Sequence, residues 1–379
     1  MTPPPLGLYV HLPWCERKCP YCDFNSHEID ALPEAAYIDA LLRDLESDLA
    51  LVPGRSVETL FIGGGTPSLF SGEGIAMLVA GIADRIPLAP NLEATMEANP
   101  GSAEANRFAA FRAAGINRLS IGVQSFSDTQ LAALGRVHNS DQAHRALEYA
   151  QAAHFDNVNI DLMHGLPGQD ETGASADLAT AMALGPAHIS WYQLTIEPNT
   201  VFFNQPPTLP VEDALATIQL RGEAALAANH YGQYEISAYA REGAQCRHNL
   251  NYWHFGDYLG IGAGAHGKLT LASGEVQRIH KRRQPERYMA GAKGGFIAGA
   301  RPLARDDLVA EFMLNALRLN AGFSVDLFES RTGCDSATLD NAVGHLCERE
   351  LLQVEDGRVS TTELGRNFLN DVLAEFLPD

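Results

Sequence analysis

The sequence predicts an α/β protein whose main part is a partial, TIM-like (β/α)6 barrel, followed by a helical, winged-helix-like domain. Short apolar runs alternate about six times with longer amphipathic patterns between residues 7 and 200, as parallel strands joined by helical crossovers do. Polar or glycine-rich residues close the first five runs. In a barrel these positions converge on one mouth, whereas an open sheet would spread them along an edge.

The totals describe a globular chain with an acidic surface. Its 379 residues suggest one large domain with one or two smaller ones, and its net charge of −20 argues against nucleic acid as a partner. The basic run at 278–287 is most simply a solvated face, with an anchor for carboxylates or phosphates as the alternative. No apolar run approaches the roughly 18 residues of a membrane span, and no secretory signal is visible, so we expect a cytoplasmic protein.

The expected elements follow the chain in order. Helical patterns cover residues 34–52 and 175–185, between apolar runs of strand length. The six strand candidates are residues 6–12, 57–65, 92–100, 118–126, 157–167 and 188–196.

The rhythm changes after residue 200, which predicts three parts: a core (1–200), a barrel extension (201–300) and a C-terminal domain (301–379). The extension starts with "PPTLP" and should hold a helix at 211–229, a strand-like stretch at 231–240, and a glycine-rich strand at 258–267 that enters a tight loop. The last part reads as three helices, a hairpin at 351–362 and a final helix. It carries 7 basic and 15 acidic residues, so we do not interpret it as a DNA-binding head.

Three of the six cysteines, Cys15, Cys19 and Cys22, lie within eight residues, just after the first strand. Three thiolates suit a [4Fe–4S] cluster with one iron lacking a cysteine. They would also suit zinc if His11 or His27 completed a tetrahedral site. The spacing alone leaves both open. The remaining cysteines are most simply small core residues.

Several motifs together resemble the radical S-adenosylmethionine (SAM) superfamily over at least residues 7–270. They are "YVHLPWCERKCPYCDF", "GGGTPS", "GVQSF", "LGRVHN" and "NIDLMHGLPGQ". The resemblance implies a radical SAM type of partial barrel, with a [4Fe–4S] cluster on the three cysteines and SAM on the fourth iron. Within the superfamily the motifs are similar to the group of oxygen-independent coproporphyrinogen III dehydrogenases (HemN) and HemW-type haem chaperones.

Two features favour the chaperones within this group. Phe24 stands where the dehydrogenases carry a fourth cysteine, and "HNLNYW" (248–253) matches the chaperone pattern H-N-x-x-Y-W. The resemblance then implies binding of cluster, SAM and haem, and delivery of haem to acceptor haemoproteins such as respiratory enzymes. Acceptors at the membrane and a homodimeric assembly are compatible with it. The alternatives are a coproporphyrinogen III dehydrogenase, disfavoured by Phe24, and a radical enzyme with another substrate.

The resemblance also implies the cofactor-binding residues. Tyr9 matches an aromatic that contacts SAM and the cluster, Arg136 matches the arginine that pairs with the SAM carboxylate, and the glycine loop would offer backbone groups to the methionyl part. The implied set is Tyr9, Phe24, Gly64, Gly65, Thr66, Glu97, Gln124, Arg136 and Asp161.

For haem, "HNLNYW" places the imidazole of His248 beside two large aromatics, so His248 is the expected axial ligand. A packing motif that closes the side of the barrel is an equally good interpretation. His266, in "GAGAHG", should face the same mouth and is a second candidate, with His254 a third. The basic run at 278–287 could pair with the haem propionates.

Overall fold

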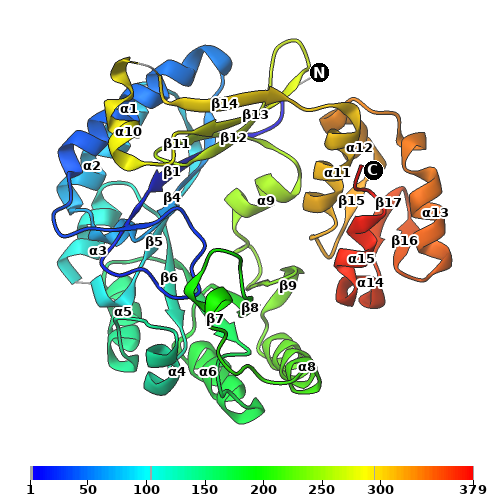
Figure 1. The fold of residues 1–379 in the computed structure, drawn as a ribbon, viewed down its shortest axis with the longest axis horizontal. Helices are drawn as coiled ribbons and strands as arrows, with labels where there is room; N and C mark the ends of the chain where they lie inside the picture. The colour runs from blue at the N-terminus through cyan, green and yellow to red at the C-terminus, as the bar shows by residue number, and fades with distance from the viewer. Residues whose placement is uncertain (1–2, 103–104, 294, 379) are drawn as a thin grey trace.

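The computed structural model describes residues 3–102, 105–293 and 295–378, and its main feature is a curved twelve-stranded sheet (Figure 1). The strand order is β14-β13-β12-β11-β1-β4-β5-β6-β7-β8-β10-β9. Its two end strands do not pair with each other, so the barrel is partial, as predicted. Six consecutive parallel strands form the centre: β1 (Leu6–Leu12), β4 (Val57–Gly64), β5 (Leu88–Ala98), β6 (Arg118–Gln124), β7 (Asn157–His164) and β8 (His188–Gln193).

Helices between these strands cover the outer face of the sheet, as Figure 1 shows. Local sequence fixes their ends. Asn139 and Gln142 form a capping box at the start of one helix, while Asp170 caps the start of another and Gly185, at φ 68°, ends it. These crossover helices are α1 (Glu34–Asp48), α2 (Gly72–Ala83), α3 (Ala105–Ala113), α4 (Asp128–Ala133), α5 (Ser140–Ala152) and α6 (Glu171–Leu184).

The chain after residue 200 extends the same sheet at both of its edges. β11 (Asp257–Ile261) pairs in parallel with β1, and β12 to β14 continue from it in antiparallel fashion. The hairpin of β9 and β10 adds to β8 at the other edge. The remaining elements are β9 (Gly232–Glu235), β10 (Ala238–Ala240), β12 (His266–Thr270), β13 (Val276–Lys281), β14 (Ile297–Pro302), α7 (Val201–Asn204), α8 (Glu212–Ala228), α9 (Arg247–Trp253) and α10 (Pro285–Met289).

Alternation along the strands separates an apolar outer core from a polar interior. In β6, Leu119, Ile121 and Val123 are fully buried in the core between sheet and helices. The intervening Ser120 and Gln124 face a cavity inside the barrel. Because successive side chains of a strand point to opposite faces, one strand supplies both the core and the site.

The C-terminal domain packs around its own core and lies to one side of the barrel (Figure 1). Three helices precede a hairpin, and two short helices follow it, which agrees with the predicted winged-helix-like order. Its elements are α11 (Arg305–Ala316), β15 (Phe323–Ser324), α12 (Val325–Thr332), α13 (Asp340–Glu348), β16 (Leu352–Glu355), β17 (Arg358–Thr361), α14 (Glu363–Asn367) and α15 (Leu369–Ala374). Across the described residues, no helix is long and apolar enough to cross a membrane.

Candidate functional site

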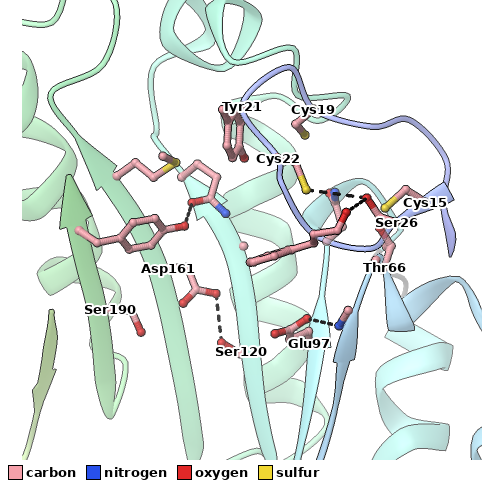
Figure 2. A pocket seen from close by; sticks show the side chains of 18 of the residues that line it. Cys15, Cys19, Tyr21, Cys22, Ser26, Thr66, Glu97, Ser120, Asp161 and Ser190 are labelled. Atoms are coloured by element: carbon pink, nitrogen blue, oxygen red, sulfur yellow. Dashed lines mark hydrogen bonds between the residues drawn. The ribbon is translucent and has the colours of Figure 1, made fainter. Parts of the chain in front are cut away.

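A cavity of about 550 Å³ opens inside the barrel at the carboxyl ends of the parallel strands. We call it the mouth cavity. In Figure 2 the cysteine loop lies above it, while Glu97, Ser120, Asp161 and Ser190 lie below. Most of the residues singled out from the sequence line this one space: Cys15, Cys19, Cys22, Phe24, Gly64, Gly65, Thr66, Glu97, Gln124, Arg136 and Asp161.

The three cysteines lie on the segment that begins in β2 (Trp14–Cys15) and returns in β3 (His27–Glu28). All three are free thiols, and burial raises the pKa of Cys15 and Cys22. Among the described residues, no three His, Cys, Asp or Glu side chains converge closely enough to chelate a single metal ion. Three thiols that line one cavity are the number and type of ligands that a [4Fe–4S] cluster with one iron lacking a cysteine would take.

His11 and Phe24 complete the surroundings of this loop. Both ring nitrogens of His11 are engaged, Nδ1 with the Tyr9 hydroxyl at 2.9 Å and Nε2 with the Asn25 carbonyl oxygen at 2.9 Å. His11 is thus held as a packing residue rather than presented as a metal ligand. Phe24 is 62% exposed and lines the mouth cavity.

The glycine loop at the end of β4 is already committed to internal hydrogen bonds. The amide of Gly64 donates to Glu97 Oε2 at 3.0 Å, that of Gly65 to the Leu12 carbonyl, and that of Thr66 to the Trp14 carbonyl. A Cβ on Gly65 would lie 2.4 Å from the Trp14 oxygen, so this close approach requires glycine. Because these amides are occupied, the backbone groups of the loop that remain for a ligand are carbonyl oxygens, which can accept hydrogen bonds from an ammonium group.

Two half-buried carboxyl groups, those of Glu97 and Asp161, lie below the loop. Burial raises the pKa of Glu97 to about 8, although the amide of Gly64 stabilises its ionised form. Burial also raises the pKa of Asp161, which accepts hydrogen bonds from the Ser120 hydroxyl at 3.0 Å and the Asn159 amide at 2.7 Å. A cationic or hydroxyl-bearing ligand that binds beside them would favour the ionised form of both carboxyl groups.

The opposite wall contains Gln124 and Arg136. Gln124 has φ 68°, an unusual backbone conformation for a residue other than glycine, and its Oε1 accepts from the Tyr192 hydroxyl at 3.0 Å. The strand register also shifts between Gly122 and Gln124, which turns the end of β6 toward the cavity. Arg136 donates to the Gly122 carbonyl at 2.8 Å.

A second cavity, of about 720 Å³, adjoins the first. We call it the aromatic cavity because Tyr9, Phe24, Tyr252 and Tyr258 line it. Phe24, Gly64 and Glu97 line both cavities. Tyr9, expected at SAM and the cluster, lies here and does not line the mouth cavity.

The structure separates the two histidines suggested for haem. His248 is 1% exposed on α9, and its ring nitrogens contact the Thr59 hydroxyl at 2.8 Å and the Tyr252 hydroxyl at 2.9 Å. Burial lowers its pKa to about 3. This geometry speaks against His248 as an axial ligand and favours the packing interpretation of "HNLNYW". His266 instead lies exposed on the rim of the aromatic cavity, stacked on His280 with ring centroids 5.8 Å apart.

The basic run at 278–287 is divided between internal and surface roles. Lys281 is buried and pairs with Asp44 and Asp48 at 2.6 Å each, and Arg278 pairs with Glu311. Of the basic side chains that we expected at the haem propionates, Arg283 lines the aromatic cavity. A sequence run thus says little about which of its charges face a ligand.

Several residues of the mouth cavity were missed by motif reasoning. All but Tyr21, which belongs to the cysteine loop, lie on the strands β6, β7 and β8, so strand periodicity was the available signal, but it required knowing which face was interior. They are Tyr21, Arg118, Ser120, Asn159, Ser190 and Tyr192.

Comparison with known proteins identifies the family. The radical SAM superfamily matches residues 9–178, and the HemN C-terminal domain matches residues 303–368. The heme chaperone HemW of Escherichia coli (strain K12) is 48% identical over 99% of both chains. The chain belongs to the HemW family. The HemW of Bacillus subtilis (strain 168) is 33% identical, over 98% of this chain and 99% of its own.

Two further relatives widen the picture. A bovine protein, "Radical S-adenosyl methionine domain-containing protein 1, mitochondrial", is 39% identical over 84% of this chain and 74% of its own. The solved structure of coproporphyrinogen III oxidase (HemN) from Escherichia coli matches with a TM-score of 0.83, at 23% identity, over 99% of this chain and 90% of that one. At this identity the match establishes the fold, which confirms the predicted radical SAM type of partial barrel.

Proposed function

We propose that this member of the HemW family is a haem chaperone, which holds a [4Fe–4S] cluster and SAM in the mouth cavity, binds haem in the aromatic cavity, and passes haem to acceptor haemoproteins. The observation that carries the proposal is the adjacency of the two cavities, which share Phe24, Gly64 and Glu97. One has three thiols, and the other has tyrosines and histidines suited to a flat iron porphyrin.

In the mouth cavity, Cys15, Cys19 and Cys22 would hold the cluster, and Arg136 would meet the carboxylate of SAM. A reduced cluster with bound SAM supplies one-electron chemistry. Glu97 and the carbonyl oxygens of the glycine loop would receive the amino group. Asp161 and Gln124 are placed for hydroxyl groups of the ribose, because both present oxygens at neighbouring strand ends.

In the aromatic cavity, Tyr9, Tyr252 and Tyr258 would pack against the porphyrin. His266 is our candidate axial ligand because its ring is exposed at the rim, whereas that of His248 is enclosed. Arg283 would pair with a propionate. A cytoplasmic site of action remains a prediction from the sequence, and membrane-bound acceptors and a homodimer remain predictions from the resemblance.

Anaerobically purified, cluster-loaded protein tests the proposal through its absorption spectrum before and after addition of haem. A Soret band that persists through gel filtration, with no conversion of coproporphyrinogen III in a parallel assay with SAM and reductant, is the expected result. Turnover of coproporphyrinogen III without haem retention would instead support the dehydrogenase alternative. Haem transfer is tested by mixing the haem-loaded protein with an apo-haemoprotein and separating the two proteins. Transfer is shown when the Soret band of the haem-loaded protein decreases and that of the acceptor appears.

A further inference from the structure

A third cavity, of about 440 Å³, lies at the end of the barrel opposite the mouth. We call it the basal cleft. Pro5 and Thr59 place it at the amino ends of β1 and β4, and α9 forms one wall. The C-terminal domain supplies the other wall through α12 and the segment before it. The cleft shares no lining residue with the mouth or aromatic cavity.

Three arginines from separate elements converge on this cleft. Arg247 begins α9, Arg331 lies near the end of α12, and Arg358 begins β17. Among the residues that line the cleft, Glu58 is the one with a carboxylate. In a chain with a net charge of −20, a local excess of positive charge is a built feature rather than a reflection of composition.

The side chains of these arginines donate to neutral backbone carbonyls, although the carboxylate of Asp257 attracts Arg331. Arg247 donates to the Asn91 carbonyl, Arg331 to the His254 carbonyl at 3.3 Å, and Arg358 to the carbonyls of residues 321 and 322. Backbone carbonyls fix the guanidinium planes but carry no net charge, and no ion pair of these three side chains occurs in the described part of the chain. An oxyanion would supply the missing counter-charge with the bidentate geometry that guanidinium prefers.

His254, the fourth cation-forming group of the cleft, reports the same field. Its pKa is lowered by burial first, and then by the positive charges of Arg331 and Arg358. Burial also lowers the pKa of Arg331 and the charge of Arg55 adds to this, whereas the carboxylate of Asp257 opposes it. Positive charges around one cleft repel one another, and a bound anion would relieve the repulsion.

The shape and lining narrow the chemical class of the ligand. The volume is that of a small-molecule site. The apolar lining is aliphatic, with Pro5, Leu250 and Leu327, and no Phe, Tyr or Trp lines the cleft, so its stacking surface is limited to the imidazole of His254. Ser324 lines the cleft as well, and its hydroxyl caps the first turn of α12 by accepting from the Leu327 amide.

We propose that the basal cleft binds a small multivalent oxyanion, a phosphate- or carboxylate-bearing molecule, clamped between Arg247 on the barrel side and Arg331 and Arg358 on the C-terminal domain. Because it is bound between the two parts of the molecule, the anion stabilises their mutual arrangement. It also contacts the wall that contains Thr59, whose hydroxyl holds His248. The site is independent of the cluster, SAM and haem.

Calorimetric titration of the full chain at low ionic strength, with sodium diphosphate in one arm and citrate in the other, tests the proposal. We expect saturable binding at one site that weakens with added salt. Arg247→Gln and Arg331→Gln should each weaken binding about tenfold or more through loss of a charge-assisted pair. Arg145→Gln and Arg349→Gln, exposed arginines on α5 and next to α13, should bind as the unchanged protein does.

The two anions distinguish the source of the oxyanion. Tighter binding of diphosphate indicates a phosphate ligand, and tighter binding of citrate indicates a carboxylate ligand. Absence of saturable binding for both, or equal weakening in the two control variants, overturns the proposal. Circular dichroism melting identifies a variant that fails to fold. Because Arg247 and Arg331 belong to different parts of the fold, the binding affinity of the other variant then tests the proposal.

Discussion

Nη1 of Arg136 lies 3.6 Å from Sγ of Cys19, across 117 residues of chain. Nη2 of the same side chain donates to the carbonyl of Gly122, on β6. The guanidinium thus bridges the cysteine loop and a central barrel strand. Because Arg136 lines the mouth cavity next to Cys19, its guanidinium can stabilise negative charge on the cysteine sulfur and on the carboxylate of a ligand.

Replacement of this arginine should weaken SAM binding. Arg136→Ala removes a charge-assisted pair, which is worth on the order of 1.5–3 kcal/mol. Calorimetry on cluster-loaded protein measures the affinity, with Arg145→Ala, exposed on α5, as the matched control. Unchanged SAM affinity in Arg136→Ala would remove this residue from the site.

The cysteines make a second prediction. Cys22→Ser should abolish the broad visible absorption of the reconstituted cluster, because its thiol lines the mouth cavity. Cys334→Ser should leave that absorption intact, since Cys334 is 7% exposed in the core of the C-terminal domain. Iron content and the visible spectrum are the measurements. Equal bleaching in both variants would contradict the assignment.

Local pattern was sufficient for the barrel and for the positions of its strand ends. The first strand, predicted at 6–12, is β1 at Leu6–Leu12, and the helix predicted at 211–229 is α8 at Glu212–Ala228. These elements are long or strongly periodic, and tertiary contacts reinforce what the sequence already favours. The cysteine spacing likewise identified three side chains that share one cavity.

Long-range contacts explain what the sequence did not reveal. "HNLNYW" forms helix α9, whose first amides donate to Glu93, a carboxylate that lies 155 residues before His248. No pattern in the neighbouring sequence predicts a helix cap from so distant a residue. The same holds for Tyr9, whose motif position predicted contact with SAM but whose side chain lies in the neighbouring cavity. Periodicity places a residue on a face of a strand, whereas the curvature of the sheet decides which cavity that face meets.

Glu97 should impose a pH dependence on stability. Its pKa is about 8 in the folded chain, against 4.5 ordinarily, because burial disfavours its charge. The folded state therefore holds more protons than the unfolded state between these values, and the free energy of unfolding falls as pH rises through this window. The contribution is on the order of a few kcal/mol.

Urea unfolding at pH 5 and pH 8 measures this effect, and Glu97→Gln isolates it. The variant mimics the protonated side chain, so its stability should fall less between the two pH values than that of the unchanged protein. Asp44, whose pKa burial raises to about 6, acts in the same direction and is present in both proteins. Identical pH profiles would show that Glu97 is ionised in the folded state throughout.

The last prediction separates the structural from the ligating histidine. His248→Ala leaves the hydroxyls of Thr59 and Tyr252 without their partner in a buried site, so it should lower the free energy of unfolding by about 2–4 kcal/mol. His266→Ala, at an exposed position, should change stability by less than about 0.5 kcal/mol but shift the Soret band and weaken haem retention. His345→Ala, a surface change in α13, is the control. Urea unfolding and haem titration are run on all three at a temperature where each is folded. If His248→Ala loses the Soret band there while His266→Ala keeps it, the ligand is His248 after all, and α9 must open to bind haem.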